Sequence, residues 1–239
     1  MPYGFGYGFN MTYIVLVLPA VILAIFASAR VKSTFKKYSQ SRTASGITGA
    51  EAAERILRSN GLYNVRVEMV SGTLSDHYDP KENVISLSQA VYGNASTAAV
   101  GVAAHEAGHA LQYAGDYGPI KLRGAIIPMT QIGSRAAIPL VIIGLLLSGF
   151  SAFFINFAYA GIICFALCVV FQLVTLPVEF NASRRAMQTI NQYGILTADE
   201  QKEARRVLSA AAMTYVAALA VSLTQLLRLL LLVSGRRRN

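Results

Sequence analysis

The amino-acid sequence predicts a mainly α membrane protein with about four transmembrane helices and a small α+β domain. Of its 239 residues, 54% are hydrophobic and only 14% are charged. In a typical soluble domain roughly a quarter of the residues are charged. The apolar residues are also concentrated in long uncharged runs, and the mean hydropathy is +0.46. These three features together favour insertion into a bilayer.

The first apolar run extends from Thr12 to Ala29 and, with the two residues before it, reaches the ~20 residues that a spanning helix needs. It follows residues 1–9, where glycines alternate with aromatic residues that favour a membrane interface. A cleaved signal peptide carries its positive charge before the apolar run, whereas here the charge follows it. We therefore expect residues 1–29 to form a retained anchor with the N-terminus outside. The basic residues after this run are Arg30, Lys32, Lys36, Lys37 and Arg42.

Residues 30–125 are predominantly polar and predict a small folded α+β segment. Thr48 and Glu51 have the spacing of a capping box at a helix start, and alternating polarity indicates strands. The expected elements are a helix over 48–59, strands over 64–70 and 84–88, and a helix that begins at Ser96 or Thr97 and ends at Ala114.

Two further apolar runs predict a transmembrane hairpin within residues 126–178. They are Ala136–Phe150 and Phe157–Val178, and a short connection separates them. Residues 179–206 are polar again, and we expect them on the same membrane face as residues 30–125.

The C-terminal segment, residues 207–239, comprises a fourth apolar run and a basic tail. If the N-terminus is outside and the chain crosses the membrane four times, Arg236–Arg238 also lie outside. This placement contradicts the positive-inside rule. Arg228 also lies within the run. Whether this run spans the membrane completely therefore stays open.

The formal net charge of +9 is concentrated near the apolar runs. Such placement favours contact with anionic lipid headgroups. No nucleic-acid-binding motif accompanies it. We expect the lipid bilayer as a partner and no nucleic acid, while the oligomeric state and any accessory partner stay open.

The chemistry is concentrated in the segment His105-Glu106-Ala107-Gly108-His109, in the middle of a predicted helix. Two histidines four residues apart lie on one helix face and can bind one Zn²⁺ ion, while the glutamate acts as general base of a metalloprotease. The residues flanking the motif are uncharged, unlike those of a chance match on a surface helix. We expect one zinc ion, held by His105 and His109, with Glu106 as the catalytic base.

A catalytic zinc ion needs a third protein ligand, and Glu179 is the candidate. It stands where the third apolar run ends, and an unpaired carboxylate there is costly. The alternative is an interfacial acid paired with Arg184 or Arg185. The other acids after the motif are Asp116, which is too close in sequence, and Asp199, Glu200 and Glu203, which have the pattern of a solvated helix start.

Nearly the whole chain resembles the YugP-like family of bacterial membrane zinc metallopeptidases, which is similar in its site to the HtpX and CaaX-prenyl-protease type. The resemblance depends on the runs Ser75–Pro80, Val102–Gln112, Pro177–Ala186 and Gly235–Arg238. It implies Glu179 as the third ligand. In related membrane zincins an Asp four residues later supports the site, and Ser183 occupies that position here.

The resulting prediction is a membrane-anchored zinc endopeptidase of the gluzincin-like HExxH type. Its zincin-type catalytic domain would lie at the cytoplasmic face of a bacterial plasma membrane and act on a peptide or membrane-protein substrate. Two alternatives remain: a non-catalytic scaffold with a structural metal, and an intramembrane-cleaving zinc protease. His77 could line the site or be a turn histidine, and the strand 84–88 could pair with an extended substrate at a free edge.

Overall fold

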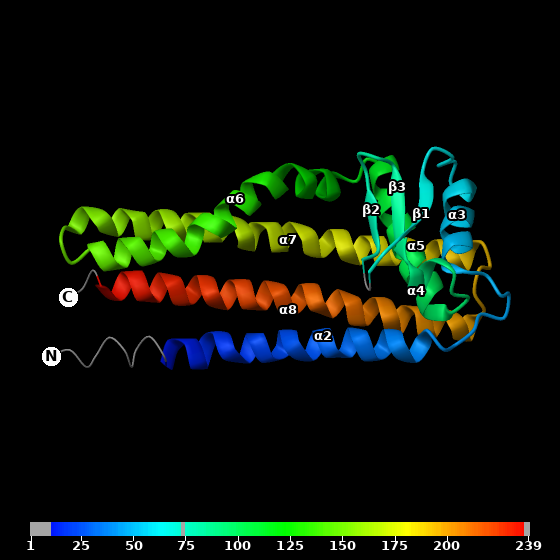
Figure 1. Cartoon of the computed structure of the whole chain (residues 1–239), viewed down its shortest axis with the longest axis horizontal. Helices are drawn as coiled ribbons and strands as arrows, with labels where there is room; N and C mark the ends of the chain where they lie inside the picture. The colour runs from blue at the N-terminus through cyan, green and yellow to red at the C-terminus, as the bar shows by residue number, and fades with distance from the viewer. Residues whose placement is uncertain (1–10, 73–74, 237–239) are drawn as a thin grey trace. The chain divides into compact units, whose positions relative to one another are not determined.

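The structure is a computed structural model, and it describes residues 11–72 and 75–236 (Figure 1). The N-terminal segment 1–9 and the last two arginines lie outside the described residues. The chain is mainly α-helical with one three-stranded sheet. The predicted fold class, a mainly α membrane protein with a small sheet, is confirmed.

Four helices are long and apolar enough to cross a membrane. Each coincides with one of the four predicted apolar runs, although the second helix ends at Leu147, before its run does. The helices are α2 (Leu18–Tyr38, preceded by the π-helical turn Tyr13–Val17), α6 (Gly118–Leu147), α7 (Ile155–Gln192) and α8 (Ala198–Arg236).

These helices extend beyond the apolar runs, which the sequence pattern did not indicate. Helix α6 begins at Gly118 and contains Pro128 and Pro139. Helix α7 continues through Pro177, so Glu179 lies inside a long helix and not at the head of a new one. Prolines are tolerated inside membrane helices because neighbouring groups satisfy the freed backbone.

The chain divides into two compact units. One comprises Met1–Phe26, Leu122–Leu176 and Tyr215–Asn239, and its described residues are mostly in apolar helix segments. The other comprises Ala27–Lys121 and Pro177–Thr214 and contains the sheet together with the HEAGH helix.

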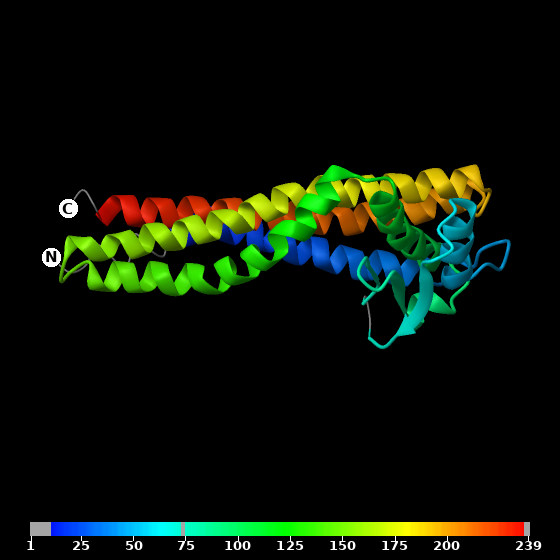
Figure 2. The ribbon, with the colours of Figure 1, turned by 90° about the horizontal axis from the view of Figure 1, so that it is seen from above.

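In the first unit, α6 and α7 lie side by side as the predicted hairpin (Figure 2). A Cβ atom on Gly144 would lie 2.3 Å from the backbone nitrogen of Ala158, and one on Gly161 would lie 2.6 Å from the carbonyl oxygen of Ala137. Small residues allow helix backbones to approach closely inside a membrane. The contact therefore requires glycine at both positions.

Arg228, which interrupts the fourth apolar run, is buried inside the first unit. Its side chain is 6% exposed, and its guanidinium carbon lies 5.1 Å from the centre of the Tyr13 ring. An aromatic face stabilises a desolvated cation. Arg228 therefore does not interrupt α8, which is continuous from Ala198 to Arg236.

The second unit packs helices around a small sheet of order β1-β3-β2. Strands β1 (Arg66–Val70) and β3 (Val84–Ser88) pair in parallel, and β2 (His77–Asp79) pairs antiparallel to β3. The helices are α3 (Gly49–Ser59), α4 (Gln89–Tyr92) and α5 (Thr97–Ala114).

Most of these elements agree with their predictions. The capping box of α3 is present between Thr48 and Glu51, and Ser96 caps α5 by accepting a hydrogen bond from the backbone N–H of Ala99. Strand β2 was not predicted, because three residues are too few for an alternating pattern.

The expected free edge of strand 84–88 is absent. β3 is the central strand, with β1 on one side and β2 on the other. Just before the start of β2, Asp76 accepts hydrogen bonds from the backbone N–H and the hydroxyl of Ser88. The sheet edges belong to β1 and β2, so substrate pairing along β3 is not available.

Candidate metal centre

Helix α5 presents His105 and His109 on one face of its C-terminal half. The two ring centres lie 4.7 Å apart at an interplanar angle of 81°. Residues four apart in an α-helix lie on the same face, one turn apart. The uncharged residues of the motif pack into the core of the second unit, where Ala103, Ala104 and Ala107 are completely buried.

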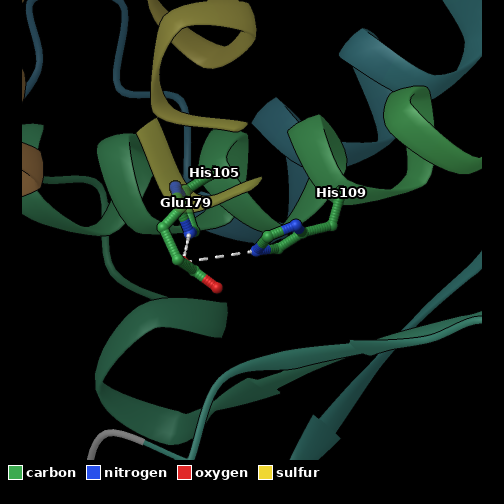
Figure 3. A group of neighbouring side chains, drawn as sticks. All are labelled: His105, His109 and Glu179. Atoms are coloured by element: carbon green, nitrogen blue, oxygen red, sulfur yellow. Dashed lines mark hydrogen bonds and ion pairs between the residues drawn. The ribbon is translucent and has the colours of Figure 1, made fainter. Parts of the chain in front are cut away.

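Helix α7 places Glu179 directly against the two histidines (Figure 3). One carboxylate oxygen, Oε2, lies 3.2 Å from Nε2 of His105 and 3.6 Å from Nε2 of His109. Glu179 is 3% exposed. The structure therefore brings together the three residues that were expected to bind the metal.

Gly108, inside the motif, allows α5 and α7 to approach closely enough for this contact. A Cβ atom at Gly108 would lie 2.6 Å from the carbonyl oxygen of Ala182. Ala182 stands between Glu179 and Ser183 on α7, so the glycine contact lies at the same level as the histidine pair. Further along the same face of α5, a Cβ atom on Gly101 would lie 3.3 Å from the Cβ atom of Ala204 on α8.

Polar partners orient the outer nitrogens of both rings. Nδ1 of His105 lies 3.1 Å from the Ser183 hydroxyl, and Nδ1 of His109 lies 2.9 Å from Oε1 of Gln112. Ser183 therefore occupies the supporting position that an Asp fills in related zincins. Gln112 was not predicted as a site residue, although its place three residues after His109 puts it on the adjacent turn.

The Gln112 amide determines which nitrogen of His109 carries the proton. Its Nε2 group donates to the carbonyl oxygen of Val178 at 2.8 Å and to Oδ1 of Asn181 at 3.0 Å. A backbone carbonyl can only accept, so the amide oxygen of Gln112 faces His109. Nδ1 of His109 must then donate, which leaves the lone pair of Nε2 directed toward Glu179 and available to a metal.

Glu106 is 8% exposed, and its negative charge interacts with His109. Among residues 11–72 and 75–236, no hydrogen bond or ion pair is formed by its carboxylate. Burial alone would lower the pKa of His109, but the hydrogen bond that the protonated ring donates to Glu179 and the negative charges of Glu106 and Glu179 raise this pKa above its ordinary value. The same negative charge favours a bound cation in place of that proton.

The donor set fits a zinc ion. Two imidazole nitrogens and one carboxylate oxygen lie within 4.8 Å of one another. Zinc sites in proteins combine these donor types, and a catalytic site takes three of them and keeps a fourth position open. No fourth His, Cys, Asp or Glu joins the group within the described part of the chain.

The other candidate residues lie elsewhere. Nδ1 of His77 lies 2.8 Å from the carbonyl oxygen of Ser75, so this exposed histidine belongs to the local structure of β2. Arg185 donates from Nε to Oδ1 of Asn181, at 2.8 Å, and so extends the network behind Gln112. The conspicuous run Ser75–Pro80 has a structural role, because Asp79 also accepts from the backbone N–H of Lys81.

The fold and the site define the class: a multi-helix membrane protein with an HExxH motif on one helix, whose two histidines meet a glutamate from a second helix in a group that could hold a metal ion. The chain belongs to the family described as "putative neutral zinc metallopeptidase", whose model matches residues 13–234. It is also 49% identical over 230 residues to the Bacillus subtilis (strain 168) protein named "Putative membrane protease YugP". The alignment covers 96% of this chain and 100% of that relative. No solved structure matches the chain.

Proposed function

We propose that this chain is a membrane-anchored zinc-dependent endopeptidase whose single metal is held by His105, His109 and Glu179. The observation that carries the proposal is the convergence of these three donors, together with a buried Glu106 whose negative charge acts on His109. Family membership supports the same chemistry.

The residues of the site have separate roles in this proposal. A zinc ion held there supplies a Lewis acid for a peptide carbonyl and lowers the pKa of a bound water to about 7. Glu106 accepts a proton from the attacking water at its carboxylate and later delivers it to the leaving amine. Ser183 and Gln112 hold the two rings with Nε2 facing inward. Burial of Glu179 and His109 keeps competing water away from the donors.

Two observations favour this function over its alternatives. A structural zinc site is closed by four protein ligands, whereas the described residues provide a group of three. An intramembrane protease would carry its motif on a spanning helix, but α5 is not one of the four helices that are long and apolar enough to cross a membrane.

We place the site on the cytoplasmic side of a bacterial plasma membrane, acting on peptide or membrane-protein substrates. The basic residues from Arg30 to Arg42 follow the first span, and positively charged loops stay in the cytoplasm.

Replacement of Glu106 by Gln tests the proposal. Glu106→Gln should keep about one zinc per chain and lower peptide hydrolysis by about 10²–10⁴-fold, because the base is lost while the ligands remain. The measurements are metal content and turnover of a quenched fluorescent peptide by the full-length protein in detergent.

The exposed Glu82 provides the matched control: Glu82→Gln should keep both zinc and turnover. The double variant His105→Ala/His109→Ala should lose the zinc. Wild-type turnover in Glu106→Gln, or full zinc occupancy in the double variant, would exclude the proposed roles.

A further inference from the structure

Away from the metal centre, five cationic side chains surround one cavity between α2 and α8. The cavity has a volume of about 970 Å³ and is lined by Arg30 and Lys37 from α2 and by Lys202, Arg205 and Arg206 from α8. All five are exposed. Among the described residues that line it, none is acidic. The cavity therefore has a strongly positive potential.

Most of this charge is not compensated by the protein. Lys202 pairs with Asp199, and Arg206 donates to the Tyr38 hydroxyl at 2.9 Å. Within residues 11–72 and 75–236, Arg30, Lys37 and Arg205 form no ion pair. Lys37 lies 5.2 Å from the centre of the Tyr38 ring. The three cations that form no ion pair converge on a cavity that no described carboxylate lines, and such a group provides a site for an anion.

The sequence position of the cavity favours a lipid over a free anion. In α2, the uncharged run ends at Ala29 and the lining begins at Arg30. In α8, Arg205 and Arg206 precede an apolar run that begins at Leu208. Both helices thus change from polar to apolar at the cavity, as expected where headgroups meet the hydrocarbon. Ala210 and Met213 add an apolar wall.

We propose that this cavity binds the phosphate of an anionic phospholipid, with the acyl chains continuing along the apolar parts of α2 and α8. The site is joined to the HEAGH helix through Tyr38, whose carbonyl oxygen accepts a hydrogen bond from the Thr97 hydroxyl at 3.3 Å. Thr97 is the first residue of α5. A bound lipid therefore stabilises the junction of α2, α8 and α5.

The test measures displacement of a fluorescent phosphatidylglycerol from full-length protein in detergent. Phosphatidylglycerol should displace the probe, whereas phosphatidylcholine and inorganic phosphate at equal phosphate concentration should not. The variant Arg30→Gln/Lys37→Gln/Arg205→Gln should bind roughly 100-fold more weakly, because each cation near anionic headgroups contributes about a factor of five. The triple variant Arg58→Gln/Arg66→Gln/Lys81→Gln has the same net charge but changes exposed residues elsewhere, and should bind as the wild type does.

The unfolding temperature without lipid shows whether each variant is folded. If the cavity variant is not folded, Lys37→Gln and Arg205→Gln alone should each weaken binding about 5-fold. Equal affinity of the cavity and control variants would overturn the proposal, as would equal displacement by phosphatidylcholine. Displacement by inorganic phosphate would assign the cavity to a free anion and overturn the lipid assignment.

Discussion

Glu179 is the residue on which the proposed metal centre depends most. Two imidazoles alone leave a divalent cation with its full charge, whereas the buried carboxylate neutralises part of it and supplies the third donor. Its nearest oxygen lies between the two Nε2 atoms, at 3.2 and 3.6 Å. A mere interfacial acid would not be expected in this position.

Glu179→Ala should therefore weaken zinc binding by more than 100-fold, beyond the 10–100-fold typical of losing an outer partner of a ligand. Glu179→Gln should have a smaller effect, because it keeps an oxygen donor and loses only the charge. Competition with a chromophoric chelator measures both affinities. Wild-type zinc affinity in Glu179→Ala would exclude Glu179 as the third ligand.

Gln112 acts through His109 and not on the metal itself. Because its amide is held by Val178 and Asn181, its oxygen keeps the proton of His109 on Nδ1. In Gln112→Leu the side chain has a similar volume but cannot accept the hydrogen bond from Nδ1 of His109, so zinc affinity should fall by about 10–100-fold.

The exposed Gln192, at the end of α7, provides the matched control, and Gln192→Leu should leave zinc affinity unchanged. Gln112→Glu can still accept from Nδ1 and should restore more affinity than Gln112→Leu does. Equal affinities for Gln112→Leu and the wild type would show that Gln112 only fills space.

At the scale of elements, the contact between α5 and α7 sets the geometry of the centre. Gly108→Ala places a methyl group 2.6 Å from the Ala182 carbonyl oxygen, so the helices must separate. Such overpacking costs about 1–3 kcal/mol of stability. The separation should also draw Glu179 away from the histidines and weaken zinc binding at least several-fold.

Chelator competition and thermal unfolding measure these two effects. Gly93→Ala is the matched control, since a Cβ atom there meets nothing within 4 Å. If Gly108→Ala binds zinc and unfolds as Gly93→Ala does, the close helix contact is not required for the centre.

The elements that could be predicted from the sequence are those with local signals. The capping box of Thr48 and Glu51 and the Ser96 cap of α5 depend on residues three apart, so the pattern alone indicates them. Strand β2 is too short to show an alternating pattern, and the role of Gln112 depends on Val178, which is distant in the chain. Glu179 could be picked out from the sequence because a lone acid beside an apolar run is unusual.

At the scale of the whole molecule, the placement of charge predicts which side of the membrane carries the centre. Ser59 is exposed at the end of α3, and Gly149 lies in the connection between α6 and α7. If the basic segment after the first span is cytoplasmic, these positions lie on opposite sides.

In a background with Cys164→Ala and Cys168→Ala, Ser59→Cys should resist a membrane-impermeant thiol reagent in intact cells, while Gly149→Cys should react. After cell lysis both should react. Ready modification of Ser59→Cys in intact cells would reverse the orientation.

The separation of the donors along the chain has a consequence for biosynthesis. His105 and Glu179 are 74 residues apart, and α6 and the apolar half of α7 lie between them. At 5–20 residues per second, the ribosome adds the glutamate roughly 4–15 s after the histidine. The centre therefore cannot be assembled until the intervening hairpin has been synthesised and has turned back. A newly made chain thus carries an incomplete set of metal donors while it enters the bilayer, and all three donors are present together only when insertion is nearly finished.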